Sequence, residues 1–88
     1  MHISGFEWNE WNIEHIAQHA VTPQEVEEAC YNQAVFRKTT GGLYLVYGQA
    51  DAGRYLFIVV RYKAGGLVYV ITARPMNKNE QKYYRKQR

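Results

Sequence analysis

The sequence predicts an α+β fold with two N-terminal helices, an antiparallel sheet of about four strands and a C-terminal helix. Before Ala34 the chain carries apolar residues at helical spacing and two helix-start signals. From Ala34 to Arg74, runs rich in Val, Ile, Leu and Tyr alternate with glycine turns, as strands do. After Pro75 the chain is polar and basic, which favours an exposed helix. A length of 88 residues fits a single domain spanning 1–88.

The two N-terminal helices have recognisable starts. The first is expected from Asn9 to about His19, with Asn9 as N-cap and Glu10 at the positive end of the helix dipole. The second starts at Thr22-Pro23-Gln24-Glu25, which has the form of a capping box with Pro at the first helical position. It should end near residues 31–33.

Four strands are expected in the middle of the chain: Ala34–Lys38, Leu43–Gly48, Arg54–Tyr62 and Leu67–Arg74. Their short, glycine-containing links predict antiparallel hairpins. Pro75 should end the last strand because proline donates no backbone hydrogen bond. A basic helix capped by Asn77 should then run toward the end of the chain.

A register with Tyr62 opposite Leu67 and Tyr47 opposite Tyr55 predicts which residues share a sheet face. Tyr47, Tyr55 and Arg74 would form a row at one end of one face, with Arg61 at its other end. The opposite face would be the core under the helices, and its expected residues are Leu56, Ile58, Val60, Leu67 and Ile71. A slip of one residue would exchange the two faces.

Several side chains have an ordinary structural interpretation. Trp8 and Trp11 are expected in the core or in a hydrophobic staple, and Cys30 as a small buried residue. His15 and His19 are one helical turn apart, but no third ligand accompanies them, so no metal site is expected. No cofactor is expected either, since the sequence has no glycine-rich phosphate loop and no nucleophile elbow.

The chain shows no feature of export or of membrane insertion. Its longest strongly apolar run, Tyr55–Val60, is too short to cross a bilayer, and Met1–Gly5 does not begin a signal peptide. A single cysteine permits no internal disulfide. We expect a cytoplasmic protein without a membrane partner.

Charge is divided unevenly along the chain. The first 36 residues hold six acids and no Lys or Arg, whereas all eleven Lys and Arg lie from Arg37 onward, with most of the tyrosines. Cations mixed with aromatic faces suit RNA or DNA. The expected RNA-binding residues are Arg54, Arg61, Tyr47, Tyr55, Lys78 and Lys82. The acidic half suits a different, basic partner.

Three residues are the candidates for chemistry on RNA. Metal-independent cleavage needs a base for the ribose 2′-OH, a cation for the charge on phosphorus and an acid for the leaving oxygen. Arg74 suits the cation role because a guanidinium holds phosphate through two parallel hydrogen bonds. Glu80 is the expected base or the group that orients Arg74, and Tyr84 or a histidine the expected acid.

Motifs along the chain resemble those of the BrnT-type toxins of bacterial type II toxin–antitoxin systems, small ribonucleases related to the RelE superfamily. In order, they are Phe6-Glu7-Trp8-Asn9, Asn12 with His19-Ala20-Val21, Thr22-Pro23-Gln24-Glu25-Val26, Ile71-Thr72-Ala73-Arg74, and Glu80 with Tyr84. The resemblance covers most of the chain. The spacing and order of the motifs carry it more than any one of them.

The resemblance implies a RelE-like fold and a ribonuclease toxin that inhibits translation and growth. It also implies a cognate antitoxin encoded by an adjacent gene, and it leaves open a homodimer or a toxin–antitoxin hetero-oligomer. The chain has Gln18 and Gln49 where the family commonly has Lys and Arg. These departures keep a second hypothesis open, a non-catalytic RNA- or protein-binding module on the same fold.

Overall fold

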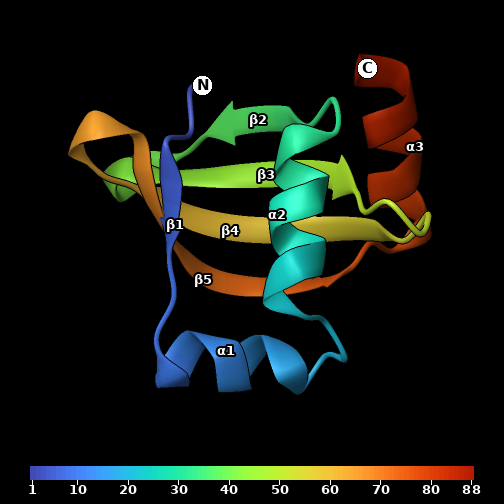
Figure 1. Ribbon diagram of the computed structural model, residues 1–88. Helices are drawn as coiled ribbons and strands as arrows, with labels where there is room; N and C mark the ends of the chain where they lie inside the picture. Colours follow the sequence, from blue (N-terminus) through green and yellow to red (C-terminus); the bar gives the residue numbers. More distant parts are fainter.

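A computed structural model describes all residues, Met1–Arg88, as one sheet with three helices (Figure 1). The elements in chain order are β1 (Gly5–Glu7), α1 (Glu10–Ala17), α2 (Pro23–Tyr31), β2 (Val35–Lys38), η1 (Thr40–Gly42), β3 (Leu43–Gln49), β4 (Tyr55–Tyr62), η2 (Ala64–Gly66), β5 (Leu67–Pro75) and α3 (Lys78–Gln87). The predicted α+β class is confirmed.

The sheet differs from the expected one. It has five strands in the order β1-β5-β4-β3-β2, and β1 runs parallel to β5 while the other neighbours are antiparallel. The expectation of about four antiparallel strands was therefore wrong. The missed strand, β1, is three residues long and begins with Gly5, so it shows no alternation of apolar and polar residues. Its pairing partner lies about 60 residues later in the chain.

All three helices begin as the sequence predicts. Asn9, Thr22 and Asn77 are the N-caps of α1, α2 and α3, and each belongs to a complete capping box. In each box the cap side chain accepts from the backbone N–H three residues later, and the side chain of that later residue accepts from the cap's own backbone N–H. Two otherwise unpaired N–H donors are thus satisfied. Local sequence alone therefore determines these three starts.

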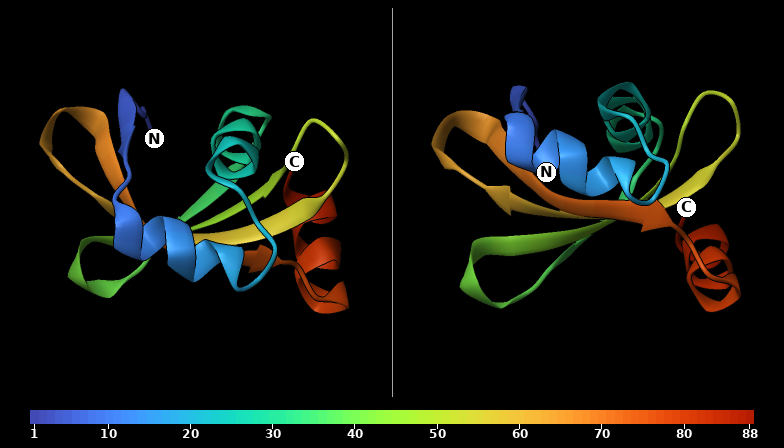
Figure 2. Two further views of the ribbon diagram at one scale, coloured as in Figure 1. Left: turned by 60° about the horizontal axis from the view of Figure 1, so that its bottom comes forward. Right: turned by 90° about the horizontal axis from the view of Figure 1, so that it is seen from below.

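The helices lie on two sides of the sheet. Helices α1 and α2 cover one face, whereas α3 lies at one end against the other face (Figure 2). Tyr84 of α3 packs there in a small cluster with Tyr47 and Met76. The face opposite α1 and α2 is left partly open beside α3.

The core under α1 and α2 confirms part of the prediction. Leu56, Ile58 and Val60 are fully buried there, as expected. Leu67 is exposed and Ile71 is only partly buried, so their placement in the core was wrong. The buried residues of β5 are Val68, Val70 and Ala73.

A one-residue shift of register at the β4–β5 hairpin and a β-bulge further along explain this difference. Tyr62 pairs with Val68, and the register shifts between Val59 and Val60, where Val59 pairs with Thr72 but Val60 pairs with Val70. Ile71 is the extra residue, and a bulge of one residue exchanges the faces on which the following side chains lie. Sequence periodicity does not reveal this shift.

Between β3 and β4, and between β4 and the part of β5 beyond the bulge, the register is two residues away from the predicted one. Tyr47 pairs with Phe57, and Phe57 pairs with Arg74, whereas Tyr55 pairs with Gln49. The predicted row of Tyr47, Tyr55 and Arg74 was therefore wrong in its middle member. A shift of two preserves the faces, so Tyr47 and Arg74 still share one.

Three further side chains test the structural interpretations. Trp11 is 56% exposed, so its expected place in the core was wrong. Trp8 is partly buried against the core, and its indole Nε1 donates to Glu27 Oε2 at 2.8 Å. Cys30 is buried, as predicted, and burial together with the charge of Glu27 raises the pKa of its thiol to about 12. No helix has the length and apolar character needed to span a bilayer.

Candidate nucleic-acid interface

Five side chains form a continuous row across the open sheet face beside α3, which we call the arginine–aromatic row. In order across the sheet its members are Arg37 (β2), Tyr83 (α3), Tyr47 (β3), Phe57 (β4) and Arg74 (β5). The ring centroid of Tyr47 lies 4.8 Å from that of Tyr83 and 5.3 Å from that of Phe57. The guanidinium of Arg37 lies 5.3 Å from the Tyr83 ring centre, and that of Arg74 lies 4.5 Å from the Phe57 ring centre. A cation therefore stands at each end of an aromatic strip.

Strand register positions the row. Tyr47, Phe57 and Arg74 are direct cross-strand partners on three adjacent strands. Val35 pairs with Tyr47, so Arg37, two residues further along β2, points to the same face. After Pro75 the chain turns back, so that α3 lies across this face. Tyr83 reaches the row from α3.

Arg74 is held by Glu80 in a two-pronged ion pair. Its Nη1 and Nη2 donate to Oε1 and Oε2 of Glu80, each at 2.8 Å, and Nη1 also donates to the Pro75 carbonyl at 3.2 Å. The side chain of Arg74 is 37% exposed and that of Glu80 is 17% exposed. The guanidinium is therefore oriented by the protein and still reaches solvent.

The Glu80 carboxylate has a second partner. Its Oε1 accepts from the backbone N–H of Asn77 at 2.9 Å, which completes the capping box of α3. The hydrogen bonds from Arg74, then the Asn77 N–H and the positive charge of Arg74, lower the pKa of Glu80 against the opposing effect of burial. Glu80 raises the pKa of Arg74 in turn, and the Tyr47 phenol adds to that increase. The pair is thus fully ionised at neutral pH.

Tyr84 does not lie beside this pair as an exposed acid. It is fully buried, and its hydroxyl donates to the Gln33 carbonyl at 3.4 Å. Nη1 of Arg88 donates to the Tyr84 hydroxyl oxygen, also at 3.4 Å. Burial keeps the Tyr84 phenol away from any ligand at the surface. The expected proton donor is therefore disfavoured, and Tyr84 serves to pack α3 onto the sheet.

The histidine alternative has one member near this face. His15 Nε2 lies 3.2 Å from Thr72 Oγ1, and Thr72 is two residues before Arg74 on β5. The His15 and His19 rings meet edge to face with centroids 6.0 Å apart. His15 instead stacks on Trp11, so the two imidazoles are not paired for a shared ligand.

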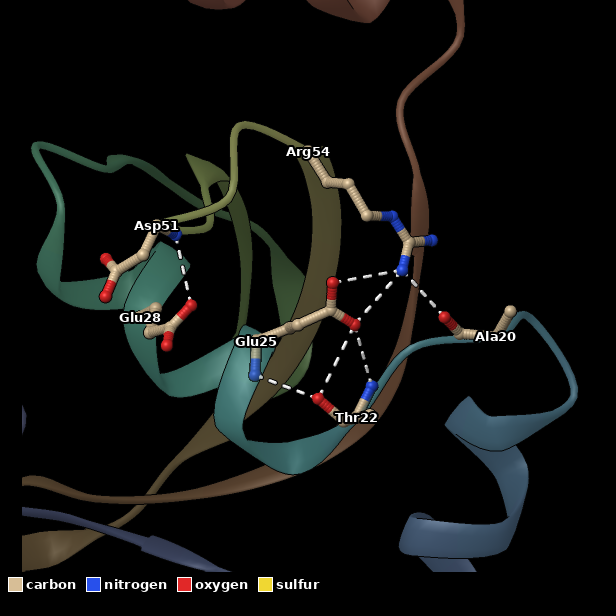
Figure 3. A network of polar contacts seen from close by, with 6 residues as sticks. All are labelled: Ala20, Thr22, Glu25, Glu28, Asp51 and Arg54. Carbon is tan, nitrogen blue, oxygen red and sulfur yellow. Dashed lines mark hydrogen bonds and ion pairs between the residues drawn. The ribbon is translucent and has the colours of Figure 1, made fainter.

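Arg54 belongs to a different part of the molecule. Its Nη1 donates to both oxygens of Glu25 at 3.0 Å and to the Ala20 carbonyl at 2.7 Å, beside the start of α2 (Figure 3). Ala20 has a φ of 58°, a conformation that costs a non-glycine residue about 1 kcal/mol. Arg54 therefore braces the α1–α2 junction, and its expected contact with RNA stays a prediction.

The other expected RNA-binding residues are spread over the open side. Arg61 is exposed, and its Nη1 donates to the Gly41 carbonyl at 2.9 Å, at the end away from Arg74. The Tyr55 ring meets the Tyr84 ring edge to face at 6.0 Å, beneath α3. Lys78 and Lys82 are exposed on α3, and no carboxylate pairs with either.

Sequence reasoning missed Arg37, Phe57 and Tyr83. Arg37 is the first cation of the chain and stands two residues after Val35 in a strand, which was a usable sign that it shares a face with its neighbours. Phe57 was missed through the wrong register, and Tyr83 because only its neighbour Tyr84 belonged to a recognised motif. Nothing local in the sequence brings α3 over β3.

Comparison with known proteins adds no relative. No family model matches the chain, and no curated protein matches its sequence.

A polar depression of about 580 Å³ lies away from Arg74, between the end of α2, the β3–β4 loop and Arg88. Its polar groups bond mainly to one another. Asn32 Nδ2 donates to Asp51 Oδ1 at 2.7 Å and to the Gln49 carbonyl at 3.1 Å, and Arg88 donates to Gln49 Oε1 at 3.2 Å. With its donors and acceptors already paired, this depression is a weaker candidate for ligand binding than the arginine–aromatic row.

Proposed function

We propose that this protein binds RNA across the arginine–aromatic row and cleaves it as a metal-independent ribonuclease toxin. The observation that carries the proposal is the oriented, partly exposed guanidinium of Arg74 at the end of an aromatic strip. The resemblance to BrnT-type toxins supplies the toxin class, the RelE-like fold and the antitoxin from an adjacent gene. A cytoplasmic location follows from an RNA substrate and an intracellular antitoxin.

The charges around the row suit a polyanion. The exposed cations on this side include Arg37, Arg61, Lys78, Lys82, Arg85 and Lys86, and none pairs with a carboxylate. Arg37, Lys78 and Lys82 flank the row from β2 and α3. Lys and Arg near a phosphate backbone release counterions on binding, so affinity should fall steeply with salt.

The cleavage step would use the Arg74–Glu80 pair. A phosphate takes two hydrogen bonds from Arg74 in place of those to Glu80, which keeps the Asn77 N–H as partner. Glu80 then accepts the ribose 2′-OH proton as that oxygen attacks phosphorus, and Arg74 stabilises the charge that develops. The bond from phosphorus to the 5′ oxygen breaks, and that oxygen takes a proton. Because Tyr84 is fully buried, solvent water supplies that proton in this proposal.

One observation favours a second candidate, a non-catalytic RNA-binding module. Both oxygens of Glu80 are already hydrogen bonded, Tyr84 is fully buried and Tyr47 is nearly so. A site whose base and acids are all engaged can bind a phosphate without moving a proton. The two candidates share the binding surface and differ only in cleavage.

Cleavage of a labelled oligoribonucleotide separates them. We expect Arg74→Ala to lower the rate by about 100-fold or more, as loss of one group that stabilises developing charge does. Growth arrest on expression of the protein without an antitoxin should disappear in the same variant. Lys63→Ala is the matched control, because Lys63 pairs with Glu7 at 2.7 Å outside the row.

The outcomes divide cleanly. Binding without cleavage by the folded wild-type protein supports the second candidate and rejects the first. Neither binding nor cleavage rejects both. Circular dichroism of Arg74→Ala confirms that any loss belongs to the site and not to unfolding.

A further inference from the structure

The outward side of α1 carries an exposed, rigid tryptophan. Trp11 has more than half of its surface in contact with solvent. Its indole stacks on the His15 imidazole with ring centroids 4.9 Å apart and planes 7° from parallel. His15 is in turn bonded to Thr72 of β5. One face of the indole is thus braced by the protein, and the fixed ring has little conformational entropy to lose on binding.

Two carboxylates without partners flank this ring. Six of the eight acids accept hydrogen bonds from protein donors: Glu7, Glu25, Glu27, Glu28, Asp51 and Glu80. The two that do not are Glu10 and Glu14, both exposed on α1. They stand four residues apart, a spacing at which like charges destabilise a helix.

We propose that this surface, formed by Glu10, Trp11 and Glu14, docks a segment rich in Lys and Arg from a partner protein. A cation over an indole face gains a cation–π interaction, and the flanking carboxylates favour the same charge. RNA is repelled by Glu10 and Glu14, so charge separates this surface from the arginine–aromatic row. The inference does not depend on ribonuclease activity, because it concerns residues of α1 and none of the arginine–aromatic row.

Binding of a peptide with alternating arginine and alanine residues tests the proposal, with a glutamate–alanine peptide as the comparison. We expect the arginine peptide alone to quench Trp11 fluorescence in a Trp8→Phe background, more strongly at low salt. Trp11→Leu keeps an apolar side chain but removes the π face, and should weaken binding about fivefold when affinity is measured from the anisotropy of a dye-labelled peptide. Glu10→Gln with Glu14→Gln should weaken it by a similar factor and reduce its salt dependence.

Two matched controls make the result specific. Tyr31→Ala removes an aromatic ring that is 59% exposed on α2. Glu27→Gln with Glu28→Gln removes the same charge from α2, where both carboxylates already have donors. Neither control should change peptide affinity, and circular dichroism should show all variants folded.

Three results would overturn the proposal. The first is equal loss of affinity in the α2 controls, which would reduce the effect to net charge. The second is quenching of Trp11 by oligouridine but not by the arginine peptide. The third is self-association in sedimentation that Glu10→Gln with Glu14→Gln abolishes, which would make the basic α3 of a second copy the occupant. RNA binding that survives any of these results leaves the proposed function intact.

Discussion

At the scale of single residues, Glu80 joins two tasks that are usually separate. The same carboxylate caps α3 and orients Arg74, so the start of the last helix and the position of the candidate phosphate-binding group are linked. Arg54 and Glu25 repeat the arrangement at α2, where a capping glutamate also holds an arginine. In both places a cap that local sequence predicts also anchors an arginine. The pairing of Glu80 with Arg74 was among the expectations, whereas the pairing of Glu25 with Arg54, 29 residues away, was not.

Replacement of Glu80 by Gln should separate charge from capping, because glutamine can still bond back to the Asn77 N–H. We expect a loss of about 0.5–1 kcal/mol in the free energy of unfolding at pH 7, the range for a partly exposed ion pair. The pKa of Glu80 is lowered in the folded protein, so its charge stabilises the fold above its ordinary value of 4.5 and ceases to do so as pH falls below it.

Urea unfolding of the wild-type protein and Glu80→Gln at a series of pH values measures this difference. The two curves should converge as the pH falls below 4.5, since protonation then removes the same charge from the wild type. A gap that stays constant down to acid pH would show that the stabilising contact is not ionic.

At the scale of elements, α2 lies unusually close to β3. A Cβ added to Gly48 would stand 2.2 Å from the Ala29 carbonyl oxygen and 3.1 Å from the Ala29 Cβ. Only glycine permits this approach, which brings the helix down onto the sheet and seals the core between Ala29 and Val46. The contact is a packing requirement and not a matter of backbone conformation.

Gly48→Ala should therefore force α2 away from the sheet. We expect destabilisation of about 2 kcal/mol or more, at the upper part of the range for overpacked cores, since the obstacle is backbone. Gly5→Ala is the control, because the nearest atom to its added Cβ is a flexible leucine carbon at 3.8 Å. Thermal unfolding of both variants checks the prediction, and equal melting temperatures would contradict it.

Elements also show how far the sequence could be interpreted. The helix starts, the four long strands and the buried Leu56 and Ile58 follow from local patterns, because capping boxes and alternation are short-range signals. The strand β1 and the bulge at Ile71 do not, since each depends on a partner strand. These long-range features affect the predicted site most. Arg74 and Tyr47 were predicted correctly, but Phe57 was missed because the predicted register was wrong, and Tyr83 because the position of α3 was not predicted.

At the scale of the whole molecule, the two proposed surfaces face different ways. The outward side of α1 lies with the helices that cover one sheet face, and the arginine–aromatic row lies with α3 on the other (Figure 2). Part of the separation of charge along the sequence thus becomes a separation in space, while Glu7 and Glu25 pair with Lys63 and Arg54. A basic protein segment and an RNA strand would not compete for one site, and each would be repelled from the other's surface.

The salt dependence of RNA binding measures the contribution of α3. For single strands the slope of log affinity against log salt is about −0.7 for each phosphate contact. Lys78→Gln with Lys82→Gln should reduce the steepness by about 1.4 if both lysines contact phosphates. Lys63→Gln should leave the slope unchanged, since Lys63 already pairs with Glu7. An unaltered slope in the α3 variant would remove this helix from the interface.

The parallel pairing of β1 with β5 has a consequence for biosynthesis. Residues 5–7 cannot pair until Leu67–Tyr69 has been synthesised. The buried Asn12 amide likewise lacks one of its partners before Val70 is present, since it donates to the Val70 carbonyl at 3.1 Å. During synthesis residues 5–7 must therefore stay unpaired until residues 67–69 of the 88 have been translated.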